Sequence, residues 1–158
     1  MKSRAPRLRH AAIACALGTG VLGAGMLGAA APAQAGEIVI TITNMRSQEG
    51  VVRACMTTQE SVFPKCRDDP AAYRTVVPAN SSATIRFNNV EPGNYAIALL
   101  HDENDNGKAD RALGMMPTEG FGFSRDARVR FGPPKFRDAV FEHGMDDQEL
   151  VIRMRYLL

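Results

Sequence analysis

The sequence lacks the short motifs that mark the common hydrolases. It has no H-x-x-x-H or H-E-x-x-H pair of histidines and no G-x-S-x-G nucleophile elbow. Only His101 and His143 lie beyond the N-terminal segment, and with Asp102 or Glu119 they leave open a histidine-dependent metal enzyme. We nevertheless expect a non-catalytic protein, because no arrangement of these side chains matches a known catalytic motif.

Acidic residues are absent from the first 35 positions, and the residues that are present there follow a recognisable order. Four basic residues within 1–9 precede an Ala/Gly-rich apolar run at 11–31, and Ala33-Gln34-Ala35 then provides a small-x-small cleavage motif. The pattern predicts a signal peptide at 1–35, which is removed, and a single domain at 36–158 that is exported to the periplasm or beyond the cell. A retained transmembrane anchor is the alternative, but the run is rich in glycine and alanine and ends at a cleavage motif.

An excess of basic charge is also missing once the signal peptide is set aside. The first 35 residues hold four of the nineteen Lys and Arg residues and none of the seventeen Asp and Glu residues, so fifteen basic groups remain against seventeen acidic ones. The net charge of the mature chain is then minus two, which gives no support for a nucleic-acid partner. No later segment is long and apolar enough to cross a bilayer.

Cysteine is scarce, and no C-x-x-C spacing suggests a redox or zinc site. Cys15 lies in the signal peptide, which leaves Cys55 and Cys66 as an even number in an oxidising compartment. We therefore expect a structural disulfide between them. Closing this short loop would stabilise the fold by roughly 2 to 3 kcal/mol.

Long amphipathic helices are absent, and short strands take their place. From Glu37 to Thr43 apolar and polar residues alternate, which is the period of a half-buried strand. Turn residues separate the runs, and only 135–141 suggests a helical turn. The pattern predicts an all-β fold: a single antiparallel sandwich of about seven strands, with runs at 37–43, 51–57, 74–77, 83–90, 95–100 and 149–156.

The segment from Gly114 to Phe136 has four Gly, three Pro and four Phe, so it predicts no long regular element. Its rings must nevertheless be covered or used. We expect a long packed loop of the Ω type in which the phenylalanines fold back onto the sandwich. The alternative is that some rings stay exposed as a platform for a ligand. The four rings belong to Phe121, Phe123, Phe131 and Phe136.

Oxygen-bearing side chains recur at alternate positions after the apolar run at 95–100, as they do in loops that wrap calcium. If Asp102 is position one, Gly107 takes the sharp-turn position six, while the bidentate Glu of an EF-hand is replaced at position twelve by Leu113. The loop is thus no EF-hand, but it predicts a calcium site of modest affinity, with a dissociation constant on the order of 10⁻⁴ to 10⁻³ M. The expected ligands are Asp102, Asn104, Asn106, the Lys108 carbonyl, Asp110 and the more distant Glu119.

A tight turn without metal is the alternative for this loop, because Asn, Asp and Gly also build turns by bonding to backbone N–H groups. The acidic side chains exceed the single lysine by three charges, which a cation would relieve. His101 precedes the loop, and we expect it to donate a hydrogen bond that orders the loop rather than to bind a metal.

Four spaced motifs resemble one bacterial family. They are GNYAI at 93–97, HDENDNGK at 101–108, EGFGFS at 119–124 and GPPKFRDA at 132–139. Together they are similar to the exported bacterial family known as domain of unknown function 2141. The resemblance implies a single exported domain of immunoglobulin-like or transthyretin-like sandwich type, and it implies no activity, substrate or catalytic residue.

The combined prediction is an exported non-catalytic β-sandwich whose acidic loop binds calcium and shapes a surface for a protein or glycan. A purely structural envelope domain without metal is the main alternative. The histidine-dependent metal enzyme is the third possibility.

Overall fold

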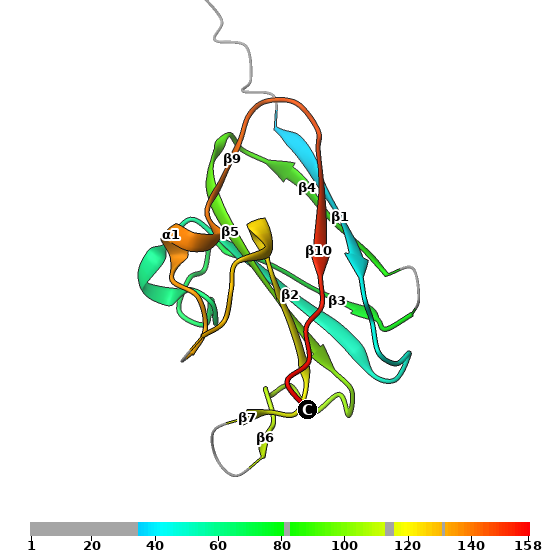
Figure 1. Cartoon of the computed structure of the whole chain (residues 1–158). Helices are drawn as coiled ribbons and strands as arrows, with labels where there is room; N and C mark the ends of the chain where they lie inside the picture. Colours follow the sequence, from blue (N-terminus) through cyan, green and yellow to red (C-terminus); the bar gives the residue numbers. More distant parts are fainter. Residues whose placement is uncertain (1–34, 81–82, 113–115, 131) are drawn as a thin grey trace, which may run out of the picture. The chain divides into compact units, whose positions relative to one another are not determined.

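The first strand, β1 (Gly36–Thr43), has isoleucine at alternate positions and lies in the middle of a three-stranded sheet. The structure is a computed structural model that describes residues 35–80, 83–112, 116–130 and 132–158. In it β1 pairs antiparallel with β4 (Thr84–Val90) on one side and parallel with β10 (Gln148–Arg153) on the other. Figure 1 shows β1 and β10 side by side although they lie at opposite ends of the domain sequence.

A second sheet is built around the longest strand, β5 (Gly93–Asp102), and every pairing in it is antiparallel. The strand order is β3 (Tyr73–Pro78), β2 (Val51–Thr57), β5 and β8 (Gly120–Phe123). A short strand, β9 (Phe141–His143), pairs with the beginning of β5. The remaining elements are η1 (Glu60–Val62), β6 (Arg111–Ala112), β7 (Met116–Pro117), η2 (Ser124–Asp126) and α1 (Phe136–Ala139).

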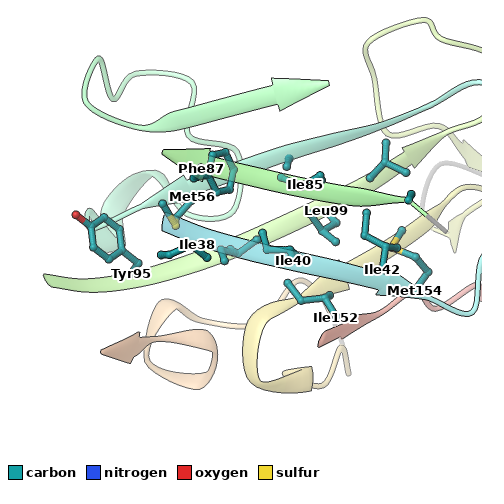
Figure 2. Close-up of a cluster of buried hydrophobic side chains, with 14 of the residues drawn as sticks. Ile38, Ile40, Ile42, Met56, Ile85, Phe87, Tyr95, Leu99, Ile152 and Met154 are labelled. Atoms are coloured by element: carbon teal, nitrogen blue, oxygen red, sulfur yellow. The ribbon is translucent and has the colours of Figure 1, made fainter. Parts of the chain in front are cut away.

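The core lies between the two sheets, where each strand turns its apolar side inward (Figure 2). Ile38, Ile40 and Ile42 of β1 are at most 2% exposed, and the period of two in the sequence predicts this alternation. The opposing residues come from β2 and β5, which contribute Met56, Ile97 and Leu99 among others. Burial of these side chains is the main force that holds the sheets together.

A smaller apolar cluster covers the outer face of β5. Ala96 and Ala98 point to this face, and the phenylalanine-rich segment folds over them. Phe121 and Phe123 are less than a tenth exposed, and the ring of Phe63 meets Phe123 edge to face at 6.0 Å. Three of the four rings therefore pack as predicted, with Phe136 half-buried, while Phe131 lies outside the described residues.

The architecture confirms the predicted fold class: it is mostly β, with packed and mostly antiparallel sheets. Several details differ from the prediction, and the short strands β6, β7 and β9 are additional to the predicted runs. The strand β10 runs parallel to β1, and the segment expected to form only a loop contains the strand β8, which pairs with β5. Its Gly-Phe-Gly-Phe sequence has no β-branched residue, so its strand conformation is stabilised by tertiary packing.

Cys55 of β2 forms the predicted disulfide with Cys66, with 6.3 Å between their Cα atoms. Such bonds persist in oxidising compartments. The predicted signal peptide lies, apart from Ala35, outside the described residues. Within the described ranges no helix has the length and apolar character needed to cross a membrane.

Candidate functional site

Asp102 is the last residue of β5 and anchors the acidic loop that follows. Its side chain is fully buried. One carboxylate oxygen accepts from the backbone N–H of Asn106 at 3.0 Å, and the other accepts from the N–H of Gly107 at 2.8 Å and from Arg53 Nε at 2.6 Å. Burial by itself raises the pKa of Asp102, but these bonds and the charge of Arg53 outweigh it and lower the pKa below its ordinary value. Asp102 is therefore ionised and fixed in position.

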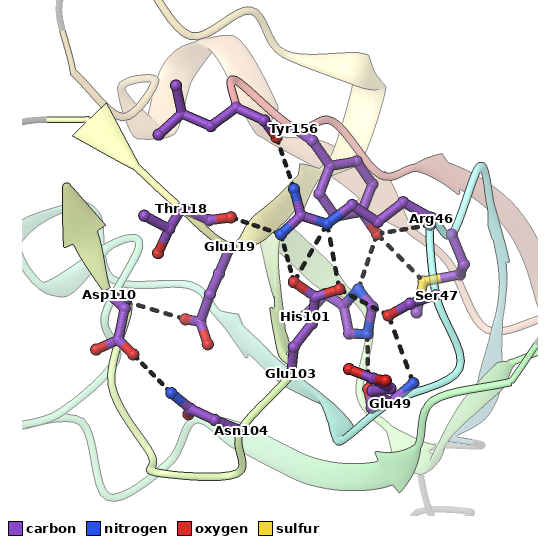
Figure 3. A network of polar contacts seen from close by, with 12 residues as sticks. Arg46, Ser47, Glu49, His101, Glu103, Asn104, Asp110, Thr118, Glu119 and Tyr156 are labelled. Atoms are coloured by element: carbon purple, nitrogen blue, oxygen red, sulfur yellow. Dashed lines mark hydrogen bonds and ion pairs between the residues drawn. The ribbon is translucent and has the colours of Figure 1, made fainter.

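The next side chains converge on Asp110. The amide nitrogens of Asn104 and Asn106 both donate to Asp110 Oδ2, each at 2.8 Å. The amide oxygens accept from the backbone: Asn104 Oδ1 from the N–H of Asn106 at 3.2 Å, and Asn106 Oδ1 from that of Lys108 at 2.8 Å. These are the local side-chain bonds typical of tight turns. Asn104 and Asn106 thus both contact Asp110, and Figure 3 shows Asn104 facing Asp110 across the loop.

Arg53 supplies a cation to this loop from the neighbouring strand β2. Besides Asp102, its guanidinium contacts Asp105 Oδ1 at 2.5 Å. Arg53 lies 49 positions before Asp102, so no local pattern in the sequence predicts this contact. Its charge neutralises part of the negative potential that a metal ion would otherwise relieve.

Glu119 contacts the backbone of Asp110 and is only 4% exposed. Its Oε2 accepts from the Asp110 backbone N–H at 3.1 Å, whereas Oε1 is buried and has no hydrogen-bond partner among the described residues. Burial, together with the negative charges of Asp102 and Asp110, raises the pKa of Glu119. A buried carboxylate oxygen without a partner is costly, so this position favours a bound proton or a bound cation.

Across the described ranges, no group of three or more His, Cys, Asp or Glu side chains is arranged to hold a metal ion. A calcium ion in this loop would therefore need amide and backbone oxygens in addition to the carboxylates. Calcium accepts such mixed oxygen ligands.

A second network adjoins the loop at Glu103 (Figure 3). The Arg46 guanidinium forms an ion pair with the Glu103 carboxylate and donates to the backbone oxygens of Thr118 at 2.7 Å and Leu158 at 2.6 Å. It also lies over the ring of Tyr156, with 4.6 Å from Cζ to the ring centroid. One arginine after β1 thus joins the acidic loop, the segment before β8 and the C-terminal residues.

Both histidines of the domain are buried in the structure. The Nε2 atom of His101 is 2.9 Å from the Glu49 backbone oxygen, and Nδ1 is 2.8 Å from the Tyr156 hydroxyl. The prediction that His101 bonds to the acidic loop is therefore wrong, since its partners lie in the turn after β1 and near the C-terminus. His143 is 1% exposed, and its Nδ1 bonds to Gln148 at 3.0 Å.

The sequence comparisons give one match. A family model described as an uncharacterized protein conserved in bacteria (DUF2141) matches residues 40–151, which confirms the resemblance drawn from the four motifs. No curated protein and no solved structure matches the chain.

Proposed function

The chain belongs to the DUF2141 family, and we propose that it is an exported, non-catalytic β-sandwich module whose loop at 102–110 binds calcium. The bound ion fixes the shape of this loop, and the loop forms part of a surface for a protein or glycan partner. The disulfide between Cys55 and Cys66 supports the proposed export, because such bonds are rare in reducing compartments. The burial of both histidines supports a non-catalytic role.

The observation that carries the calcium proposal is the unpartnered Oε1 atom of Glu119. It belongs to a buried carboxylate whose other oxygen bonds to the backbone of Asp110. The Asp110 carboxylate is met by two amide groups, from Asn104 and Asn106. A half-turn of either amide turns its oxygen towards Asp110, at the expense of the bond that this oxygen accepts from a backbone N–H group. The two carboxylates, two amides and the Lys108 carbonyl would then supply most of the six to eight oxygens that calcium requires.

A metal-free structural loop is the second candidate, and the contacts of Arg53 favour it. Arg53 pairs with Asp102 and Asp105 and places a permanent cation next to the loop. In this alternative the backbone N–H groups and Arg53 satisfy the acidic residues, and Glu119 is protonated. The two candidates differ in one measurable property, which is the response to calcium.

Calcium is expected to raise the melting temperature of the purified protein. At 10 mM calcium and a dissociation constant on the order of 10⁻⁴ to 10⁻³ M, the stabilisation is about 1.5 to 2.5 kcal/mol. For a domain of this size it corresponds to a shift of roughly 5 to 10 °C. Differential scanning calorimetry measures the shift, and isothermal titration calorimetry measures the dissociation constant.

Two variants and one control assign the response to the loop. Asp110→Asn and Glu119→Gln each remove one charged ligand and are expected to weaken calcium binding at least tenfold. Asp146→Asn removes an exposed carboxylate from the turn before β10 and should leave binding unchanged. If calcium produces neither heat nor a rise in melting temperature, the metal-free loop is correct.

A further inference from the structure

An open cleft of about 650 Å³ lies on a part of the domain that the acidic loop does not touch. One wall follows β8 and the other leads into α1. The lining residues are Arg125, Asp126, Ala127, Arg128 and Arg130 on the first, and Gly132, Pro133, Pro134, Lys135 and Asp138 on the second. A cleft of this size accommodates a small-molecule ligand. Figure 1 shows α1 and the short turn of η2 near each other on this side of the second sheet.

The segment from Ala127 to Arg130 alternates in burial. Ala127 is buried and Val129 is half-buried, and both contact the outer apolar cluster. Arg128 and Arg130 are exposed. The two arginines therefore lie away from the outer apolar cluster, and both line the cleft. The apolar residues between them anchor the backbone that carries both guanidinium groups.

The charge of the cleft is opposite to that of the mature domain. Four cationic residues line it, Arg125, Arg128, Arg130 and Lys135, against two carboxylates. Asp126 is already paired with Arg155, with 2.5 Å between Nη2 and Oδ2, and Asp138 accepts from the Lys135 backbone N–H at 3.3 Å. Within the described ranges the Arg128 and Arg130 guanidinium groups make no hydrogen bond or ion pair.

The backbone around the cleft is conformationally restricted at several positions. Arg125 and Asp126 both have positive φ, 56° and 52°, a conformation that costs a non-glycine residue of order 1 kcal/mol or more. The opposite wall contains Pro133 and Pro134, whose rings limit backbone motion. A binding site whose backbone is restricted before binding loses less entropy when a ligand arrives.

We propose that this cleft binds a ligand that carries a phosphate group, with Arg128 and Arg130 as the principal contacts. A guanidinium group donates two parallel hydrogen bonds to a phosphate and keeps its charge at any physiological pH. Lys135 adds a third positive charge from the opposite wall. The phosphate belongs either to a soluble phosphate ester or to a lipid headgroup, and the two sources share this chemistry.

Binding of inorganic phosphate to the purified protein tests the proposal. We expect a dissociation constant on the order of 1 mM or lower in calcium-free, low-salt buffer, measured by NMR titration or calorimetry. The double variant Arg128→Gln with Arg130→Gln should weaken binding at least tenfold. The double variant Arg128→Lys with Arg130→Lys keeps the charge but loses the paired hydrogen bonds. Its affinity for phosphate should lie between that of the parent protein and that of the double glutamine variant. Because calcium is absent from the buffer, the result is independent of the proposed calcium site.

Arg111→Gln is the matched control, because Arg111 is an exposed arginine on β6 and does not line the cleft. It should bind phosphate as the parent does. Co-sedimentation with phosphatidylglycerol vesicles, compared with phosphatidylcholine vesicles, distinguishes a lipid headgroup from a soluble ester. The proposal is overturned if neither inorganic phosphate nor anionic vesicles bind, or if Arg111→Gln weakens binding as much as the double glutamine variant.

Discussion

Replacing Gly50 by alanine is expected to lower the free energy of unfolding by about 3 to 4 kcal/mol. Gly50 precedes β2 and has a φ of +66°, which an L-residue adopts at a cost of roughly 1 to 2 kcal/mol. A Cβ atom there would lie 2.1 Å from the Asp102 backbone oxygen and 2.6 Å from the Glu103 carbonyl carbon. Both contacts are with backbone, so the start of the acidic loop would have to move.

Urea unfolding at equilibrium measures this effect, and two other glycines separate its two causes. Gly107 also has positive φ, but its Cβ would meet only the end of Arg53 at 4.0 Å, so Gly107→Ala should cost about 1 kcal/mol. Gly144→Ala meets nothing within 4 Å and should change stability by less than about 0.5 kcal/mol. If Gly50→Ala lowers the free energy of unfolding no more than Gly107→Ala does, the close contact between Gly50 and the backbone of the acidic loop is refuted.

Replacing Glu103 by glutamine is expected to cost about 2 kcal/mol at pH 7 and almost nothing near pH 2. The hydrogen bonds from Arg46 lower the pKa of Glu103 to about 2, from an ordinary value of 4.5. Because the pKa is lower in the folded state, the carboxylate stabilises the fold above about pH 5. This contribution is lost as the pH falls through 4.5 towards 2.

Denaturant unfolding of the parent and of Glu103→Gln at several pH values between 2 and 7 measures this dependence. The difference between the two curves isolates Glu103 from other groups, including Glu119, whose raised pKa acts in the opposite direction. Glu149→Gln is the control, since it removes an exposed carboxylate from β10. Equal pH responses in the two variants would show that the pair of Arg46 and Glu103 does not stabilise the fold.

Local periodicity predicted most of the fold but not its pairing. The alternation at 37–43 correctly assigned Ile38, Ile40 and Ile42 to the core, because strand faces repeat every two residues. The same alternation is identical for parallel and antiparallel neighbours, so it contained no sign that β10 runs parallel to β1. The strand β8 escaped prediction because its glycines and phenylalanines have no strand pattern of their own.

In the candidate site, too, contacts between residues close in sequence could be predicted, and contacts between residues far apart in sequence could not. The loop from Asp102 to Asp110 was predicted because its spacing lies within a few residues, and the structure shows Glu119 accepting from the Asp110 backbone N–H. The contacts of Arg53 and Arg46 join residues 49 and 57 positions from their partners. Such pairs leave no pattern in a single sequence, because any partly exposed arginine on a strand or in a turn has the same local appearance.

The parallel pairing of β1 with β10 governs the order in which the domain can form. Ile38 lies opposite Gln148, 110 positions later in the chain, so the central strand of the first sheet lacks one neighbour until the last strand has been synthesised. Contacts of such high sequence separation slow folding and delay it until nearly the whole polypeptide has emerged. A nascent chain that ends before residue 148 leaves one edge of β1 unpaired, and that edge can pair with other chains.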